Sequence, residues 1–365
     1  LDEGDEVLLN VAPEASPDAS GIVVAPGRVV NYAPIWRMQG GVSGTESAGA
    51  WMTQFDMNAV EYTGLIKIDI LGLSQLRACR RTVELAVESG EGGLTKDRAP
   101  RMDDFCRWLN LHGAADGDGG GTGLVALHAP RVWALLAAGD STNVFQVERS
   151  GMRRYLKTLR PSNLDDLSAL LALYRPGPLE AGLAGAFVAA KREARGERAL
   201  RHGEGATSRF PPRVEKVVRE RVAADTEGFP IYQEHILKMS RELAGFSLAA
   251  ADILRRAMGK KKASEMERQH AAFVAGAVKN GYTAGEAMAT FEVMEHFSRY
   301  GFNKAHSTAY AFLTFATAWL KAVCPASFAA AALEVRSGEK YRKPDYIMET
   351  HSVLGLLPPD LERNG

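Results

Sequence analysis

The stretch that decides the fold is YGFNKAHSTAY, at positions 300–310, with the apolar run Ala309–Leu320 that continues from it. Asn303 has a side chain that caps helix starts well, so the sequence predicts a helix beginning there. His306 and Tyr310 are four residues apart and would share one face of that helix. The apolar run ends at Lys321, which makes it too short to cross a bilayer. We therefore expect a helix of a globular protein and no contact with a membrane.

Helical patterns flank this stretch over most of the chain. Tyr232, Ile236, Met239 and Leu243 recur at steps of four, three and four, which predicts one apolar helix face. Helical spacing also starts near Gln75. Before that point, short β-type runs bounded by Gly and Pro predict strands at 21–24 and 65–70. The expected fold class is α+β and predominantly α, with a small β-containing unit at 1–75 and a large helical unit at 76–365. Flexible loops are expected near 90–123 and 191–213, where Gly, Pro and charged residues accumulate.

Composition limits the possible classes of protein. The chain has 365 residues, of which 46% are hydrophobic and 24% charged, so it is globular and not disordered as a whole. The charges of its 44 basic and 44 acidic residues cancel, so any binding of nucleic acid must come from local basic patches. Three cysteines without CxxC spacing argue against a disulfide framework or a zinc site and favour a cytoplasmic location.

The predicted strand at 65–71 carries two charged residues in alternation with apolar ones. Ile66, Ile68 and Ile70 would share one face, and Lys67 and Asp69 would share the other, about 6.6 Å apart along the strand. A carboxylate and an ammonium on a rigid strand suit a site for Mg²⁺ and a phosphate. The alternative is a strand with one wet face and a surface ion pair.

A dense positive segment, LRRAMGKKK, occupies positions 254–262. Arg255, Arg256, Lys260 and the two lysines after it have no acid among them, and phosphate is the natural partner of such a cluster. The segment lacks the glycine and Ser/Thr positions of a P-loop. The alternative is a solvated helix end at which Gly259 stops the helix.

Two further constellations point to nucleotides or nucleic acid. An imidazole and a phenol ring side by side, His306 and Tyr310, could receive a nucleotide by stacking and phosphate contact. Alternatively, they are a half-exposed His and a packed Tyr. Arg149, Arg153 and Lys157 share a predicted helix face and could contact a DNA backbone, although a solvated helix face has the same pattern.

Taken together, these segments resemble the catalytic core of the bacterial DNA polymerase III alpha family, the C-family replicative polymerases. The resemblance covers the chain from about Gly21 to Asp360, and any single motif would be weak. The matching stretches follow the order of the family and lie at 53–57, 67–73, 144–152, 172–178, 231–234, 254–261, 300–306 and 356–360.

The resemblance implies an architecture and roles for individual residues. Residues 1–75 would be the end of the thumb and the C-terminal part of the palm, and residues 76–365 would be the fingers. Asp69 matches the third catalytic, metal-binding aspartate of the palm. The residues implied to line the site for the incoming deoxynucleoside triphosphate are Lys67, Arg255, Arg256, Lys260, Asn303, Lys304, His306 and Tyr310.

The resemblance also implies cofactors and partners. Family members hold two Mg²⁺ ions with three aspartates, two of them in an Asp-x-Asp strand well upstream of the third. No such strand precedes Asp69 here, so only one ligand is present. We therefore expect the chain alone to have little or no polymerase activity. Implied partners are primer-template DNA, deoxynucleoside triphosphates, the sliding clamp and other replicase subunits. The alternative is a non-catalytic module, derived from that polymerase, that binds primer-template or a protein.

Overall fold

The computed structural model describes residues 6–9, 21–37, 51–69, 72–97, 99–100, 123–197, 210–260 and 263–336. Internal contacts divide the chain into two compact units, Leu1–Ser74 and Gln75–Gly365. The first contains the described strands and the second is helical, so the predicted α+β class with helices predominating is confirmed. Among the described helices, none has the length and apolar character needed to cross a membrane.

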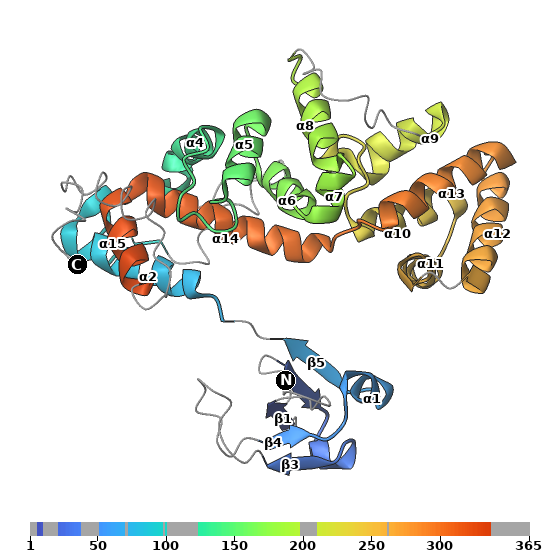
Figure 1. Ribbon diagram of the computed structural model, residues 1–365, viewed down its shortest axis with the longest axis horizontal. Helices are drawn as coiled ribbons and strands as arrows, with labels where there is room; N and C mark the ends of the chain where they lie inside the picture. Colours follow the sequence, from blue (N-terminus) through green and yellow to red (C-terminus); the bar gives the residue numbers. More distant parts are fainter. Residues whose placement is uncertain are drawn as a thin grey trace. The chain divides into compact units, whose positions relative to one another are not determined.

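The small unit is built on an antiparallel sheet of strand order β1–β2–β5 (Figure 1), with bounds Glu6–Leu9, Gly21–Ala25 and Ile66–Asp69. The predicted strands at 21–24 and 65–70 are thus confirmed to within a residue or so. A second pair joins β3 (Ile35–Arg37) to β4 (Trp51–Thr53), and α1 (Met57–Tyr62) precedes β5. The described core of this unit consists of Val23, Ala25, Val29, Ala33, Val60 and Leu65.

The alternation of charged and apolar residues in β5 suggests that the charged face is exposed to solvent, but the structure differs. Lys67 lies opposite Val23, which is fully buried, so the half-buried Lys67 is on the core side of the sheet. Ile66 and Ile68 are 64% and 45% exposed on the other side. The reading of β5 as a strand whose charged face is the wet one is therefore wrong. Alternation gives two faces, but only the neighbouring strand and helix decide which of them is covered.

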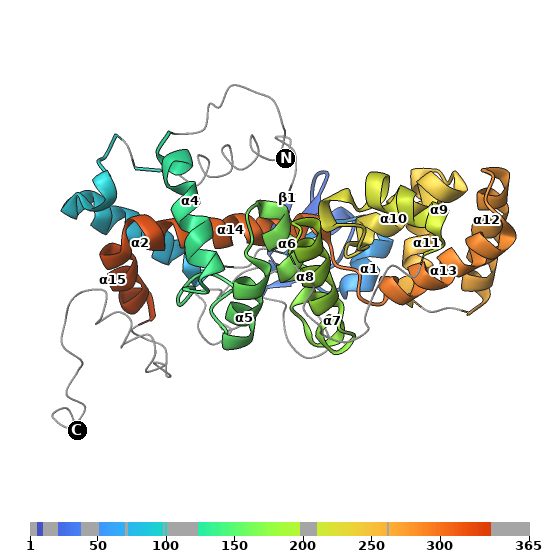
Figure 2. The ribbon, with the colours of Figure 1, turned by 90° about the horizontal axis from the view of Figure 1, so that it is seen from above.

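The large unit is assembled around a long helix, α14 (Lys304–Val323), which packs along α4 and α6 (Figures 1 and 2). Thirteen of its residues are buried, Phe315 and Trp319 fully. The other α-helices in the described part of this unit are α2 Ser74–Ser89, α4 Gly123–Ala137, α5 Ser150–Leu159, α6 Leu164–Leu173, α7 Pro176–Glu180, α8 Leu183–Ala194, α9 Pro212–Val217, α10 Gln233–Ala244, α11 Leu248–Lys260, α12 Ala263–Lys279, α13 Ala284–Ser298 and α15 Pro325–Arg336.

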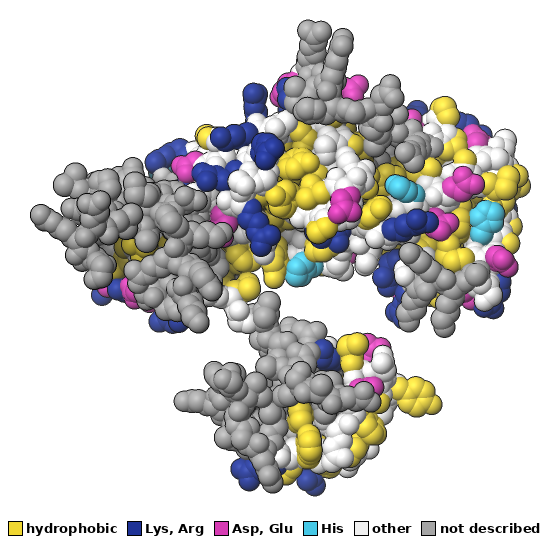
Figure 3. All heavy atoms as spheres, viewed as in Figure 1, with side chains coloured by type: hydrophobic (Ala, Val, Ile, Leu, Met, Phe, Trp, Pro, Cys, Tyr) yellow, Lys and Arg dark blue, Asp and Glu magenta, His cyan; other side chains and the backbone are white. Residues whose placement is uncertain are grey.

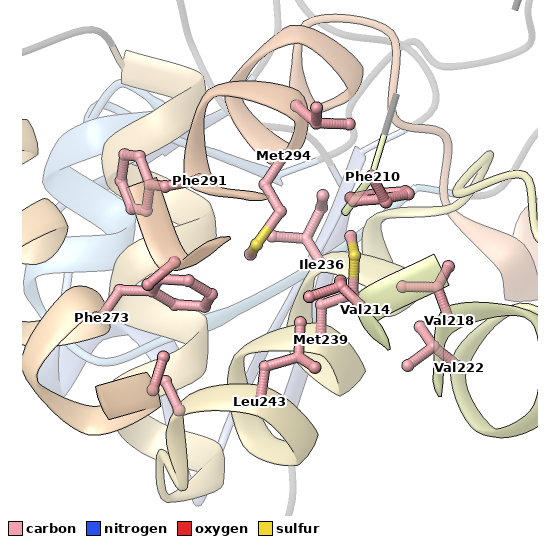
Figure 4. Close-up of a cluster of buried hydrophobic side chains, with 14 of the residues drawn as sticks. Phe210, Val214, Val218, Val222, Ile236, Met239, Leu243, Phe273, Phe291 and Met294 are labelled. Carbon is pink, nitrogen blue, oxygen red and sulfur yellow. The ribbon is translucent and has the colours of Figure 1, made fainter. Parts of the chain in front are cut away.

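A hydrophobic cluster holds α9 to α13 together (Figure 4). The predicted apolar face of α10 supplies Ile236, Met239 and Leu243 to it, each no more than 1% exposed, so that prediction is confirmed. The rings of Phe273 on α12 and Phe291 on α13 meet with centroids 5.6 Å apart. Burial of such side chains contributes about 1.5–3 kcal/mol each, so this cluster fixes the helices on which the positive segment 254–262 stands.

The loops predicted from Gly and charge content are partly ordered. At 90–97, Glu91 accepts hydrogen bonds from the backbone N–H groups of Ala326 and Ser327 (2.9 Å each) and so caps α15. At 191–194 the chain is still helix α8, because Lys191 is drawn inward by ion pairs of 2.9 Å to Asp166 and to Glu227. A flexible basic linker beginning at Lys191 is therefore wrong. The remainder of both predicted loops, including 101–122 and 198–209, lies outside the described residues.

Candidate nucleotide-binding site

The starts of α10 and α14 lie side by side, although they are about 70 residues apart in the sequence. The Gln233 N–H donates to the Phe302 carbonyl oxygen at 2.9 Å, and the Phe302 N–H donates to the Ile231 carbonyl oxygen at 3.2 Å. This short parallel bridge brings together two stretches that the sequence singled out separately, 231–234 and 300–306.

The predicted helix cap at Asn303 is confirmed. Its side-chain oxygen accepts a hydrogen bond from the His306 N–H at 2.8 Å. Glu234 on α10 also reaches this helix end, where its carboxylate oxygens accept from the Lys304 N–H at 3.0 and 3.1 Å. A carboxylate at a helix N-terminus is favoured by the orphan N–H groups and the helix dipole. Asn303 and Lys304 therefore build the start of α14, whatever else they contact.

Lys304 belongs to a half-buried charge cluster with Asp225 and His235. Its Nζ lies 2.5 Å from Asp225 Oδ2, and His235 Nε2 lies 3.4 Å from Asp225 Oδ1. Burial by itself raises the pKa of Asp225, but contacts with His235 and Lys304 outweigh it and hold the pKa well below its usual range. Burial lowers the pKa of His235, so its imidazole is neutral. Its Nδ1 accepts the Tyr232 N–H, which leaves the ring proton on Nε2, facing Asp225.

Buried hydroxyl groups tie α14 to α6 beneath this cluster. Ser168 Oγ lies 2.9 Å from the Tyr232 hydroxyl and donates to Ser307 Oγ at 3.0 Å, while Ser307 donates back to the Ser168 carbonyl oxygen. All three side chains are at most 1% exposed. Buried hydroxyls that satisfy one another rigidify their surroundings, so this network fixes the first turn of α14.

An aromatic row runs along the surface of α14. The ring centroids of His306 and Tyr310 are 4.2 Å apart, which confirms that they share one face. Phe302 lies 5.6 Å from His306 at one end, and Phe145 lies 5.1 Å from Tyr310 at the other. His306 is exposed and the other three rings are half-buried. The Arg175 guanidinium stacks 4.5 Å from the centroid of Phe302. Of the four rings, the exposed His306 is the one most open to solvent or to a ligand.

The arginines of the positive segment are held by one carboxylate. Arg255 donates from Nε and Nη2 to Asp252 Oδ1 at 2.9 and 2.8 Å, and Arg256 Nε lies 2.8 Å from Asp252 Oδ2. Hydrogen bonds from Arg255 lower the pKa of Asp252. Helix α11 continues through Gly259 to Lys260, so the reading of Gly259 as a helix stop is wrong. The side chain of Lys260 lies outside the described residues.

Arg255 connects the ion pairs around Asp252 to the aromatic row on α14. Its Nη1 lies 3.4 Å from Gln233 Oε1, and the backbone of Gln233 is bonded to Phe302 as described above. Arg255, Gln233, Phe302, His306 and Tyr310 therefore follow one another in contact. We call this set the α10–α11–α14 strip.

The basic face on α5 is only partly available to a ligand. Arg149 and Lys157 are exposed, but Arg153 donates from Nε to the Gly139 carbonyl oxygen at 2.8 Å and closes the end of α4. Gly139 has a φ of +66°, and an added Cβ would meet Lys157 Cε at 2.8 Å. Figure 3 shows Lys and Arg side chains gathered over α4 and α5.

Strand β5 places Lys67 and Asp69 on one face, as the alternation predicts, in register with Val23 and Gly21 of β2. The Asp69 side chain lies outside the described residues. Within the described ranges no three His, Cys, Asp or Glu side chains come together as metal ligands would. Of the buried cysteines, Cys79 and Cys324 are free thiols, and burial raises the pKa of each to about 12.

Comparison with known proteins now bears on the same segments. Residues 122–281 match the family model for the finger domain of the bacterial DNA polymerase III alpha subunit. Residues 6–72 match the family model for the bacterial DNA polymerase III alpha NTPase domain. The chain belongs to the bacterial DNA polymerase III alpha family.

The relatives are long proteins of which this family member spans only part. It is 35% identical over 352 residues to DNA polymerase III subunit alpha of Thermus aquaticus and 34% identical over 355 residues to that of Escherichia coli K12. The subunit of Pseudomonas aeruginosa is 35% identical over 348 residues. These alignments cover 95–97% of this chain but only 25–27% of each relative. The chain spans about a quarter of the length of the relatives that it matches.

Several residues in or next to the strip of this polymerase III alpha chain were not singled out by their own chemistry. Asp252 is one, and its spacing of three and four residues before Arg255 and Arg256 was an available signal for helical ion pairs. Gln233 and Glu234 appeared only as part of a motif. Phe145 and Arg175 also appeared only within the matching stretches 144–152 and 172–178. Their contacts with α14 are tertiary, such as the hydrogen bond from the Phe145 N–H to Thr317 Oγ1 at 3.1 Å.

Proposed function

We propose that this chain carries the site for the incoming deoxynucleoside triphosphate of a DNA-directed DNA polymerase. The observation that carries the proposal is the α10–α11–α14 strip, in which Arg255 reaches a row of rings through Gln233, with Arg256 beside it on α11. Arg255 meets Gln233 at 3.4 Å, and the rings of His306 and Tyr310 follow at 4.2 Å from each other. Guanidinium groups suit phosphate and ring faces suit a base, so the strip matches both ends of a nucleotide.

The proposed roles follow the chemistry of each group. Arg255 and Arg256 bind the triphosphate by forked hydrogen bonds and offset the charge that develops on the departing pyrophosphate. His306 and Tyr310 face the base and sugar. Lys304 and Asn303 position the start of α14, and Lys260 adds positive charge at the end of α11. Primer-template DNA is proposed to pass along α5, where Arg149 and Lys157 contact its phosphates and Arg153 holds the helix in place.

The palm strand contributes one carboxylate to the proposed reaction. Mg²⁺, which the family implies, neutralises phosphate charge and lowers the barrier to attack by a 3′-hydroxyl when it is bound. Asp69 is one candidate ligand and Lys67 one candidate phosphate contact, and the described residues supply no further cluster of metal ligands. We expect the pure chain to extend no primer, and detectable primer extension would contradict this expectation.

The proposal is tested by calorimetric titration of the chain with deoxynucleoside triphosphate in the presence of magnesium. The comparison is with an Arg255→Ala/Arg256→Ala variant. We expect binding by the native sequence and a loss of at least tenfold in affinity in the variant, since hydrogen bonds to charged groups contribute about 1.5–3 kcal/mol each. Equal binding by both proteins would refute a triphosphate site on α11.

The alternative, a module that binds primer-template or a protein without binding nucleotide, predicts a different result. It would leave the nucleotide titration flat while DNA binding through α5 persisted. The α10–α11–α14 strip favours nucleotide binding over the alternative, because contacts with the phosphates of a DNA backbone do not require stacked rings.

A further inference from the structure

Asp252 stands in an unusual position for a residue next to a proposed triphosphate site. Its two carboxylate oxygens are divided between the two arginines, with Oδ1 facing Arg255 and Oδ2 facing Arg256, at 2.8–2.9 Å. The Arg255 contact uses Nε and Nη2, which form the forked edge that a phosphate also uses. The carboxylate therefore occupies the same hydrogen-bond donors that the phosphate requires.

The Asp252 carboxylate is the main negative charge next to Arg255 and Arg256. Among the described residues, neither Arg255 nor Arg256 forms an ion pair with any other acid. The only other side chain that Arg255 meets there is the neutral Gln233. The three charged side chains are 28%, 66% and 33% exposed for Arg255, Arg256 and Asp252, so solvent and ligands reach them.

We propose that Asp252 is the counter-anion of Arg255 and Arg256 when no ligand is bound. A polyphosphate that binds to the two arginines displaces the Asp252 carboxylate, and the carboxylate pairs with them again when the polyphosphate leaves. This inference rests on the proposed function, because it concerns the same arginines. A half-exposed ion pair is weak, so a ligand with several negative charges displaces it readily. The return of the carboxylate shortens the residence of the product pyrophosphate, since the departing anion leaves no unpaired guanidinium behind.

If phosphate replaces the Asp252 carboxylate on the arginines, removal of the carboxylate charge should strengthen phosphate binding. A purely structural ion pair does not predict this result. In Asp252→Asn the arginines keep a polar neighbour of the same shape but lose the competing charge. The net charge facing the ligand rises by one unit. We expect the affinity for inorganic tripolyphosphate to rise about fivefold or more, with slower dissociation. If Asp252 served only to position the arginines, the same change would weaken binding.

The experiment is a titration of the full chain with inorganic tripolyphosphate, followed by calorimetry and by NMR of the arginine Nε–H groups. In the native sequence the Nε–H signals of Arg255 and Arg256 should shift together on titration, as they exchange carboxylate for phosphate. In Asp252→Asn the midpoint should fall to a lower concentration. Glu265→Gln is the matched control, since it removes one negative charge from an i,i+3 pair with Arg268 on the next helix. It should leave the midpoint unchanged.

The outcomes separate this inference from the proposed function. Unchanged or weaker tripolyphosphate binding in Asp252→Asn, or no binding by that variant at all, overturns the counter-anion role. The proposed function fails in a different way, when the arginines bind tripolyphosphate with the expected Asp252 dependence but the chain shows no affinity for a deoxynucleoside triphosphate. A thermal unfolding scan of each variant shows whether the helix is intact and excludes unfolding as the cause.

Discussion

Asp225 illustrates how single residues hold this site together. It lies between Lys304 on α14 and His235 on α10, and its side chain is only 19% exposed. A carboxylate so placed is retained only because its partners compensate for the lost hydration. Its loss would leave Lys304 without its carboxylate partner at the helix start, next to the row of rings.

The first prediction concerns Asp225→Asn. We expect the free energy of unfolding of the large unit at pH 7 to fall by about 2 kcal/mol, because one partner of a half-buried ion pair is neutralised. The folded-state pKa of Asp225 lies below the ordinary aspartate value of 3.8, so its stabilising contribution is complete above that pH and is lost on acidification below it. The difference between native and variant proteins should therefore shrink as the pH falls below about 4.

Thermal unfolding followed by circular dichroism between about pH 2 and pH 7 checks this prediction. Glu84→Gln serves as the control, because its carboxylate is 42% exposed and paired with Arg80 on the surface of α2. It should change the unfolding free energy by no more than about 0.5 kcal/mol. A constant difference between native protein and Asp225→Asn over the whole pH range would contradict the assignment.

At this scale the sequence predicts some contacts well and misses others for a physical reason. The Asn303 cap and the pairing of His306 with Tyr310 follow from spacing within one helix, and both are confirmed. The Lys304–Asp225 contact joins residues 79 positions apart, so no local pattern could indicate it. Charge runs were also misleading. The positive segment at 254–262 has no acid inside it, yet Asp252 one turn earlier pairs with both arginines.

Among the elements, the packing of α12 on α10 depends on a glycine. Gly276 lies in the last turn of α12, and a Cβ added there would fall on the Ala244 carbonyl oxygen at the end of α10, with the Ala244 carbonyl carbon at 3.1 Å. The two helices therefore approach more closely than any residue with a side chain would allow. This contact sets the position of α11, which follows α10 directly.

The second prediction follows from that contact. Gly276→Ala should lower the free energy of unfolding by about 2 kcal/mol, because backbone on a neighbouring helix has to move. Gly185→Ala is the control, in the first turn of α8, where an added Cβ meets nothing within 4 Å. It should be neutral or stabilise by up to about 1 kcal/mol, since alanine favours a helix over glycine. Denaturant titration of both variants checks the pair, and equal effects would contradict this account of the α10–α12 contact.

Element boundaries show where sequence reasoning stops. The apolar face of α10 was predictable because the spacing of its buried residues is regular. The end of α8 was not, because Lys191 and its neighbours look like a linker until Asp166 is placed beside them. The covered face of β5 was equally hidden, because an alternating strand contains no information about which side its neighbours cover.

At the scale of the whole molecule, the net charge is zero, so the proposed binding of DNA depends on a local basic patch. The third prediction is that Arg149→Ala/Lys157→Ala weakens binding to primer-template and reduces its dependence on salt. Each phosphate contact that is lost lowers the slope of log affinity against log salt by about 0.9. Arg153 is left in place, because it supports the end of α4.

Fluorescence anisotropy with labelled primer-template at several salt concentrations measures that slope. Arg80→Ala removes an exposed, ion-paired arginine from α2 and is the control, with no change expected in the slope. An unchanged slope in the α5 variant would show that DNA lies elsewhere on the molecule.

The central claim is that three segments far apart in the sequence form one nucleotide site on the large unit. Hydrogen–deuterium exchange of the chain, with and without a deoxynucleoside triphosphate and magnesium, tests it most directly. We predict that nucleotide slows exchange together in 231–235, 248–258 and 301–312, while α5 at 150–159 is unaffected. Slowed exchange confined to other segments, or none in the α10–α11–α14 strip at saturating nucleotide, would contradict the account.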